Sequence, residues 1–544
     1  MVNYEPDVSR LLALYQQLED DIIADMVRRI LKMGFVSEST AYQAEVLQTA
    51  GLLYDDILQL LANRTDASVA QVRALFEDAG VQTVELDNET HEAAGEAPVD
   101  IRQDSGMKQV LEAGYRKTLG TMRNLVNTTA NATQTAFIQT CDRAYMQMSS
   151  GAFSYQEAIR SAVRQLADGG AYVYYPTGHR DRIDVAVRRC VLTGVGQTSA
   201  AVAKQQAEDA GCKYMELTAH GGARPEHAKW QGQLVVIQGE RTKAYIDGLK
   251  VFTLREIGYG DGSGFKGWNC RHNWHPYYPG LSTPNYTPEQ IKQLDARTIA
   301  YNGEKYTEYE VSQMQRAGER KVRALKRRTL AAQTAVENAP DEETKAALQA
   351  DYAANAVKLK AAEKQLKDFC RQTGRQNDTF RQQANGFGRS ASQKAVHAAS
   401  EKKRLTIDWD SGKIDTEVFR KSIQKGYVKT KVEKNKQIKH TYNKQWKNQV
   451  KQAVQSFSDP DPKKRQTPRS VLRKDIDPQE IVDKYGGTGK MESSSKGDCV
   501  NEFITLPFVV GKTFEKKKGK YVDTHTVQIK YSAKGVHIFP TYSE

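Results

Sequence analysis

Several features that would assign a protein to a class at once are missing from this chain of 544 residues. It has no run of about 18 apolar residues, which excludes a conventional membrane-spanning helix. Residues 1–12 lack a basic segment that leads into an apolar one, so we expect no standard secretory signal. The six cysteines are scattered without paired spacing, which argues against a disulfide framework and favours synthesis in a reducing cytoplasm.

A surplus of positive charge is also missing from most of the chain. Residues 1–400 hold 48 basic and 48 acidic side chains, whereas residues 401–544 hold 31 and 18. The net charge of +13 therefore belongs entirely to the last 144 residues. This abrupt change predicts a neutral body joined to a basic module that has a different partner, for which nucleic acid is the best candidate.

The chain is too long for a single hydrophobic core, so several domains are predicted. We expect a multidomain, mainly α protein with a small central α+β unit, a long helical hairpin and a C-terminal α+β domain built on an antiparallel sheet. Shifts in composition predict a helical N-terminal region over 1–170, a Gly/His-rich α+β unit over 171–285, a helical hairpin over 286–373, a polar linker over 374–434 and a basic domain over 435–544.

Apolar periodicity identifies the helices of the first 210 residues. Ser154 and Glu157 have the spacing of a capping box, which predicts a helix that stops near Gly169. The acidic segment 88–100 is expected to be a loop, and a further helix is expected over 182–210. The first helix is predicted from an apolar stripe at three- and four-residue steps, which consists of Leu11, Leu14, Leu18, Ile22, Met26 and Ile30.

Two long helical patterns follow residue 286. The first is interrupted at Asn338–Asp341, and an Ala-rich second helix runs to about Phe369. This arrangement predicts an antiparallel helical hairpin or coiled coil. It is either a structural spacer or assembly arm, or an arm that binds DNA. The first helix is marked by one apolar seam of Val311, Met314, Val322, Leu325 and Val336.

Histidines and a cysteine are concentrated in the central, glycine-rich part of the chain. His220 and His227 lie six residues apart, and Cys270 and His272 add two further N/S donors. Four such donors suit a tetrahedral zinc site, although Cys-x-His is not a usual zinc knuckle. Alternatively these side chains hydrogen-bond loop backbones, or the cluster is catalytic, although no nucleophile–base pair is evident from the spacing. No cofactor is assigned from the sequence.

The tract His220–Gly232 together with Asn269–His272 resembles the phage minor capsid protein 2 family, which is related to the Mu F-like head morphogenesis proteins of tailed phages. The resemblance spans roughly residues 5–400. It implies a low-copy, non-enzymatic component of the virion that works near the portal during head assembly. The implied partners are the portal and other capsid proteins, and the protein would be made in the cytoplasm of a bacterial host.

The basic C-terminal module is expected to begin with helices and end with strands. Residues 436–457 have one apolar stripe, and Asp477 followed by Pro478 has the form of a helix start. The stripe consists of Ile438, Tyr442, Trp446, Val450 and Val454. Three strand-like runs then cover 503–510, 520–531 and 535–542.

The last two strands permit an inference about register. With a turn at Ser532–Gly535, Lys530 lies opposite His537 on one face of the sheet. RNA cleavage by transesterification uses such a pair, because a neutral imidazole takes the 2′-hydroxyl proton and a cation stabilises the phosphorane. His440 and His525 are candidates for the second acid–base group. Alternatively the basic sheet binds phosphate without chemistry.

Three blocks of the module, 436–440, 477–490 and 529–540, are similar to the polymorphic toxin type fifty family. That resemblance implies a ribonuclease with the barnase–EndoU–colicin–RelE fold, and the chain departs from the family pattern over 491–526. The carried-over catalytic candidates are His440, His537, Lys530 and Thr488. The candidates for binding the substrate phosphate are Lys436, Lys439, Lys484 and Ser532.

Two hypotheses follow for the whole chain. The first is a phage minor capsid protein that carries a toxin-like, metal-independent ribonuclease, which an acidic immunity protein would complement. The second is a purely structural virion protein whose basic tail binds packaged DNA without catalysis.

Overall fold

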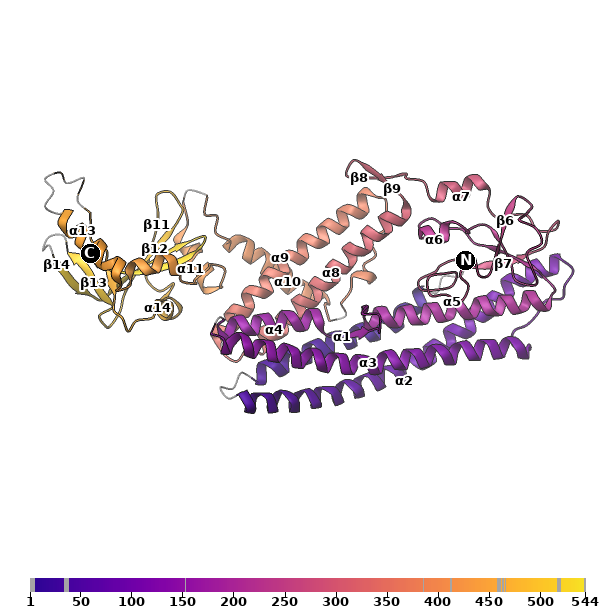
Figure 1. Ribbon diagram of the computed structural model, residues 1–544, viewed down its shortest axis with the longest axis horizontal. Helices are drawn as coiled ribbons and strands as arrows, with labels where there is room; N and C mark the ends of the chain where they lie inside the picture. The colour runs from indigo at the N-terminus through magenta and orange to yellow at the C-terminus, as the bar shows by residue number, and fades with distance from the viewer. Residues whose placement is uncertain are drawn as a thin grey trace. The chain divides into compact units, whose positions relative to one another are not determined.

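A computed structural model describes residues 5–33, 39–151, 153–384, 386–410, 413–456, 461, 464, 466–515 and 520–542 (Figure 1). The chain divides into two compact units, which are described separately here. The first unit comprises Met1–Pro340 and Lys358–Lys394, and the second comprises Asp341–Val357 and Ala395–Glu544. None of the described helices is long and apolar enough to cross a membrane.

Long helices dominate the first unit. The predicted apolar stripe of α1 is buried from Leu11 to Ile30, except that Leu14 is half-buried. The capping box at Ser154 and Glu157 is confirmed, with each side chain bonded to the backbone N–H of the other residue. The expected loop over 88–100 is wrong for its first residues, since α2 continues through them. The helices are α1 (Glu5–Met33), α2 (Ser39–Ala93), α3 (Ser105–Ser149), α4 (Tyr155–Gly169) and α5 (Ile183–Asp209).

Buried ion pairs join four segments of the first unit. The Glu19 carboxylate of α1 accepts hydrogen bonds from Arg182 and Arg327, each at 2.6 Å. Arg323 donates to Asp184 at the start of α5. Removal of Glu19 would take away the carboxylate that pairs with both Arg182 and Arg327, and we expect this to destabilise the helical body because a buried charge without its partner is costly.

A five-stranded sheet forms the expected small α+β part of the first unit. The strand order is β5-β6-β4-β3-β7, and all neighbours are antiparallel except β4 and β6. Trp230, Phe265 and Trp274 contribute to the core on one side of this sheet. The elements are β3 (Tyr214–Leu217), α6 (Pro225–Ala228), β4 (Leu234–Val236), β5 (Tyr245–Ile246), β6 (Leu249–Thr253) and β7 (Trp274–Tyr277), preceded by the hairpin β1 (Tyr172–Tyr174) and β2 (Arg180–Arg182).

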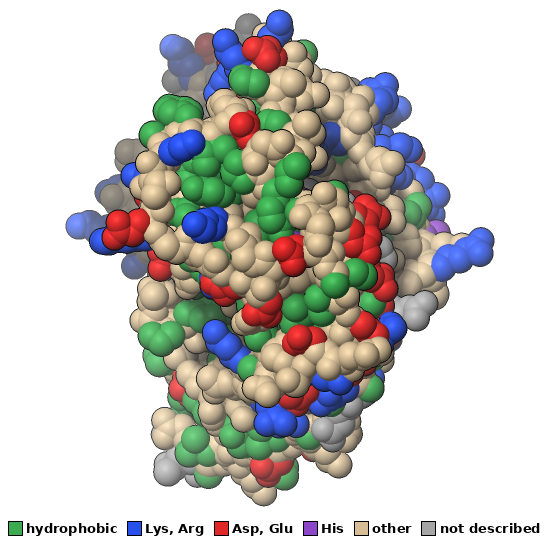
Figure 2. Space-filling model, turned by 90° about the vertical axis from the view of Figure 1, so that its right-hand side faces the viewer, with side chains coloured by type: hydrophobic (Ala, Val, Ile, Leu, Met, Phe, Trp, Pro, Cys, Tyr) green, Lys and Arg blue, Asp and Glu red, His purple; other side chains and the backbone are tan. Residues whose placement is uncertain are grey.

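Charge on this part of the body is mixed. Acidic and basic side chains are interspersed with hydrophobic ones on the face that Figure 2 shows. This agrees with the balance of basic and acidic residues in the first 400 positions. The visible face therefore carries no field of a single sign that would attract a polyanion.

Two helices follow the sheet, at the place where the sequence predicts a helical pair. They begin later than residue 286, because α7 (Pro288–Leu294) and the hairpin β8 (Ile299–Tyr301) and β9 (Glu304–Tyr306) come first. The helices are α8 (Glu308–Glu337) and α9 (Glu342–Gln372). Within the first unit, apolar residues of α8 pack against Leu359, Leu366 and Phe369 of α9.

The segment expected to be a polar linker, 374–434, is folded over much of its length. Phe419, which is fully buried, and Ile414 belong to the core of the second unit. Ser422 donates a hydrogen bond to Leu405 O at 2.6 Å and thereby links two of the helices. Few apolar residues suffice here because they pack against the buried face of a sheet formed by later residues. The elements are η1 (Phe380–Gln382), α10 (Arg389–Leu405) and α11 (Thr416–Gln424).

The basic end of the chain contains two antiparallel sheets, of strand order β11-β12-β15-β16 and β10-β13-β14. One face of the first sheet is buried against α14 and α11. The helices are α12 (Lys434–Gln437), η2 (Ile438–His440), α13 (Lys444–Ser456) and α14 (Pro478–Tyr485). The strands are β10 (Val471–Leu472), β11 (Lys490–Ser493), β12 (Val500–Thr505), β13 (Gly511–Glu515), β14 (Lys520–Thr524), β15 (Thr526–Ser532) and β16 (Gly535–Thr541).

Two expectations about this region are wrong in detail. The single helix over 436–457 is broken, because the Asn443 side chain accepts from Trp446 N and donates to Ile438 O, so a new helix starts there. The side chains of the stripe are half-buried or exposed, and Ile438 is 50% exposed. The single strand over 520–531 is divided at His525, where the chain passes from one sheet to the other. The helix start at Asp477 is confirmed.

Candidate functional site

The predicted register of the last hairpin is confirmed. Lys530 of β15 lies opposite His537 of β16, and Ser532 lies opposite Gly535. Asn501 of β12 lies opposite Lys530 on its other side. Because directly opposed side chains share a face, Asn501, Lys530 and His537 form a row across the sheet. We call the face that carries this row the open face, since the opposite face is the buried one.

His440 reaches the open face through a side-chain contact between α12 and β16. The Gln437 amide donates to Ile538 O at 2.8 Å and accepts from Ile538 N at 2.9 Å. His440 follows three residues later, and its ring stacks on Phe539 with centroids 4.7 Å apart. The rings of His440 and His537 are stacked at 6.1 Å.

The environment keeps both imidazoles neutral. Burial is the largest cause that lowers the pKa of His537, and together with the nearby charges of His440, Lys436 and Lys530 it brings the pKa to about 4. Burial also lowers the pKa of His440, against the raising effect of its hydrogen bond to Ser470 O. Since a carbonyl oxygen only accepts, this 3.1 Å bond places the proton on Nδ1 and leaves Nε2 available. At neutral pH either ring can therefore accept a proton.

A carboxylate also lies at this site, and the sequence analysis missed it. Glu433 N donates to Val536 O at 2.8 Å, directly before His537. Its carboxylate lies 2.9 Å from Lys436 Nζ and 3.3 Å from Ser532 Oγ. The hydrogen bond from Lys436 lowers the pKa of Glu433. The sequence could have indicated Glu433, because its spacing from Gln437 and His440 matches one face of a helix.

The candidate phosphate ligands divide into two groups. Lys436, Lys439 and Ser532 belong with the imidazoles, because Lys436 and Ser532 contact Glu433 and the charge of Lys439 lowers the pKa of His440. Lys484 instead lies exposed on α14, the helix that covers the buried face of the sheet.

The structure also does not bring Thr488 to the imidazoles. Its hydroxyl donates to Tyr485 O at 2.7 Å. The loop around it is held by Glu502, whose carboxylate accepts from Gly487 N at 2.9 Å and Gly489 N at 2.6 Å. Glu502 is fully buried and, as the neighbour of Asn501 in β12, points to the opposite face.

His525 is likewise separated from the row that Lys530 and His537 form. It lies at the far end of β15, where its Nδ1 is 3.2 Å from Leu506 O. Of the two candidates that the sequence left open for the second acid–base group, His440 is the one whose ring stacks against that of His537.

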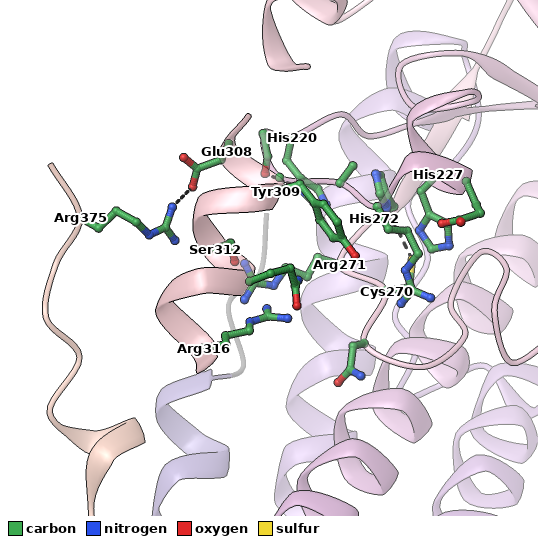
Figure 3. Close-up of a pocket in the computed structure, with 17 residues that line it drawn as sticks. His220, His227, Cys270, Arg271, His272, Glu308, Tyr309, Ser312, Arg316 and Arg375 are labelled. Carbon is green, nitrogen blue, oxygen red and sulfur yellow. Dashed lines mark hydrogen bonds and ion pairs between the residues drawn. The ribbon is translucent and has the colours of Figure 1, made fainter. Parts of the chain in front are cut away.

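The central histidines and cysteine do come together, as Figure 3 shows. The antiparallel pairing of Leu217 with Trp274 brings the loop after β3 beside the loop before β7. Cys270 Sγ lies 3.6 Å from His272 Nδ1. The His272 ring centroid is 4.3 Å from that of His220 and 5.3 Å from that of His227.

These groups line one end of a hollow of about 320 Å³. Burial lowers the pKa of His272 to about 2, and burial also lowers those of His220 and His227. The remainder of the hollow is formed by α8 and by several arginines, of which Arg375 is paired with Glu308 (Figure 3). The lining arginines are Arg224, Arg271, Arg316 and Arg375.

The fold and the two sites thus define a two-part protein, with a mainly helical body and a basic terminal unit. Residues 4–371 match the family model of phage minor capsid protein 2, and residues 422–540 match that of bacterial toxin 50. The first match covers more than half of the chain, and the chain therefore belongs to the phage minor capsid protein 2 family. Both predicted resemblances are confirmed, the second for the C-terminal part alone, and the first match ends before residue 400.

Two relatives are named structural protein. The one from Lactococcus phage LL-H is 23% identical over 310 residues, which cover 54% of this chain and 78% of that protein. The one from Lactococcus phage mv4 is 38% identical over 81 residues. These residues cover 15% of this chain and 57% of that protein. No solved structure matches the chain.

Proposed function

We propose that this phage minor capsid protein carries a metal-independent ribonuclease toxin at its C-terminus. The observation that supports the proposal best is the stacked pair His440 and His537, which shares the open face with Lys530. The match of residues 422–540 to a toxin family agrees with it. The barnase–EndoU–colicin–RelE fold is part of this proposal and rests on the resemblance.

In the proposed reaction, neutral His537 accepts the proton of the ribose 2′-hydroxyl. The 2′-oxygen forms a bond to the adjacent phosphorus, and the bond from phosphorus to the 5′-oxygen breaks. Protonated His440 donates a proton from Nε2 to the leaving 5′-oxygen, so the proton count balances. The substrate phosphate favours this protonated form, and the Lys530 ammonium stabilises the phosphorane.

Neighbouring groups would position the RNA. Lys436 and Lys439 supply further positive charge for the backbone phosphates. Asn501 presents a buried side-chain oxygen, Oδ1, that has no hydrogen-bond partner among the described residues. We infer that a hydroxyl or amino group of the substrate satisfies this oxygen, because an unpartnered buried polar atom is costly.

The body would place this domain in the phage head. The proposed partners are the portal and other capsid proteins, with synthesis in the host cytoplasm, as the family and the names of the relatives suggest. The competing function is a structural one, in which the basic unit holds packaged DNA by neutralising phosphates. The surplus of positive charge after residue 400 favours nucleic acid in either case.

The test compares the full chain with His537→Ala and His440→Ala on a labelled RNA, with His525→Ala as the matched control. We expect each of the first two changes to lower cleavage at least about 100-fold, and the control to cleave normally. A substrate with a 2′-deoxy nucleotide at the scissile position should resist cleavage, and a chelator should have no effect. Salt-sensitive DNA binding without RNA cleavage, unchanged by His537→Ala, would establish the structural function instead.

A further inference from the structure

The central cluster presents more lone pairs than its own protons can satisfy. His227 Nε2 lies 2.8 Å from Ser263 O, and His220 Nδ1 lies 2.9 Å from Gly221 O. A carbonyl oxygen only accepts, so both of these ring nitrogens carry protons. The other nitrogen of each ring is therefore a bare acceptor. In the described structure His220 Nε2 is buried and has no hydrogen-bond partner.

The tautomer of His272 is fixed in the same way. The Gln231 amide oxygen accepts the backbone N–H of His220 at 3.2 Å, so the oxygen must face this cluster. His272 Nε2 lies 3.3 Å from that oxygen and must donate to it. Its Nδ1 is then bare and faces Cys270 Sγ at 3.6 Å. The single thiol proton can satisfy one of the three bare nitrogens.

We propose that His227, Cys270 and His272 bind a zinc ion, with His220 Nε2 as the fourth ligand. The first three residues already offer ligand atoms within 4.8 Å of one another. In a tetrahedral zinc site, a thiolate sulfur and an imidazole nitrogen lie about 3.6 Å apart. The ion takes up all the bare lone pairs at once, and soft sulfur with imidazole nitrogen is the donor set that zinc prefers.

The surroundings resemble the supporting shell of a metal site. Each of the three imidazoles is oriented by an oxygen acceptor on its other nitrogen, as metal-bound histidines usually are. Arginines line the same hollow, but the Cys270 thiolate offsets one charge of the ion and the Glu226 side chain lies there too. With four protein ligands the site is closed, so the ion would join the loops around β3 and β7.

Metal analysis of the purified full chain tests this proposal. We expect about one zinc per chain in the wild type, and after replacement by cobalt a thiolate-to-cobalt charge-transfer band. Cys270→Ser should abolish that band, whereas Cys190→Ser, a matched change on α5 outside the cluster, should keep it. His220→Ala should retain the band but lose metal to a chelator at least tenfold more readily.

Two results would overturn the proposal. One is a wild-type chain that holds no zinc and gives no thiolate band with cobalt. The other is a Cys270→Ser variant that, with unchanged helical circular dichroism, binds cobalt as the Cys190→Ser control does. If Cys270→Ser does not fold, the cobalt spectrum of the wild type decides the matter alone. The RNA cleavage assay is independent, because the cluster lies in the first unit.

Discussion

Gln437 and Ile538 are joined by two hydrogen bonds, although they lie 101 positions apart in the sequence. The Gln437 amide thereby acts as one more strand partner for β16, and it fixes the turn that carries His440. The position of one imidazole over the other depends on this contact. Because Gln437 is buried, water could not readily take the place of its amide as the hydrogen-bond partner of Ile538.

We predict that Gln437→Ala lowers RNA cleavage through position rather than chemistry. Loss of both bonds leaves the N–H and C=O of Ile538 without their partner and should cost roughly 2 kcal/mol of unfolding free energy. We expect kcat to fall while the pH profile keeps its shape, because both imidazoles remain. Gln424→Ala, at an exposed position of α11, is the control. A profile displaced along the pH axis would contradict this role.

A second prediction concerns the acid side of the pH profile. His537 must be neutral to act as a base, and its pKa is about 4 in the folded chain. The acid limb of kcat/KM should therefore lie well below the value of about 6.5 expected for an ordinary histidine. In kcat the limb should move upward, because bound phosphate favours the imidazolium. The two rings are close enough to titrate as a pair, so the limb belongs to both.

The stability of the folded chain should also depend on pH, because folding lowers the pKa of His537. The unfolded chain binds a proton at His537 below pH 6.5, whereas the folded chain does so only near pH 4. The unfolded state therefore binds more protons in this window, and stability falls as the pH drops from 6.5 to 4. We expect a loss of about 1–2 kcal/mol after screening is considered. Hydrogen exchange of the β15 and β16 amides measures it, and His537→Asn should reduce the loss.

A third prediction concerns the loop around Thr488, which is held by Glu502 and not by the imidazoles. The buried Glu502 carboxylate accepts from two loop amides and from the Tyr531 hydroxyl at 2.6 Å. Glu502→Gln replaces one acceptor oxygen with a donor and should destabilise the second unit by roughly 2–3 kcal/mol. Glu492→Gln, an exposed neighbour in β11, should have little effect.

A substitution of Thr488 in that loop tests whether this residue takes part in RNA cleavage. Because its hydroxyl is used by Tyr485 O, Thr488→Val should leave the cleavage rate within about twofold of the wild type once folding is matched. A large loss of kcat in a stably folded Thr488→Val chain would return this residue to the list of catalytic candidates.

The sequence predicts contacts between residues that are close in the chain better than contacts between residues that are far apart in it. The opposition of Lys530 and His537 could be read because a short turn and strict alternation fix the register of a hairpin. The approach of His440 could not, since it depends on the bonds between Gln437 and Ile538.

The same distinction explains the other successes and errors. The capping box at Ser154 is local and was predicted correctly. The break at Asn443 is also local, but the regular stripe on both sides of it concealed the cap. The meeting of His220 with His272 required the β3–β7 pairing, which no spacing in the sequence reveals.

A fourth prediction concerns a protein partner of the open face. Lys436, Lys439 and Lys530 make this face positive, and a cell that synthesises a nuclease needs protection from it. We predict that a gene next to this one encodes a small acidic protein that binds the face and blocks cleavage. Complementary charge speeds such an association, so its rate constant should fall steeply as salt is added.

Charge reversal on the two sides of the sheet tests where that protein binds. Lys436→Glu should weaken binding at least tenfold, because it places a carboxylate beside Glu433 in the middle of the positive face. Lys484→Glu makes the same change on α14, which covers the buried face, and should bind as the wild type does. Equal loss with both variants would show that net charge alone drives the association. Equal retention would place the partner elsewhere on the chain.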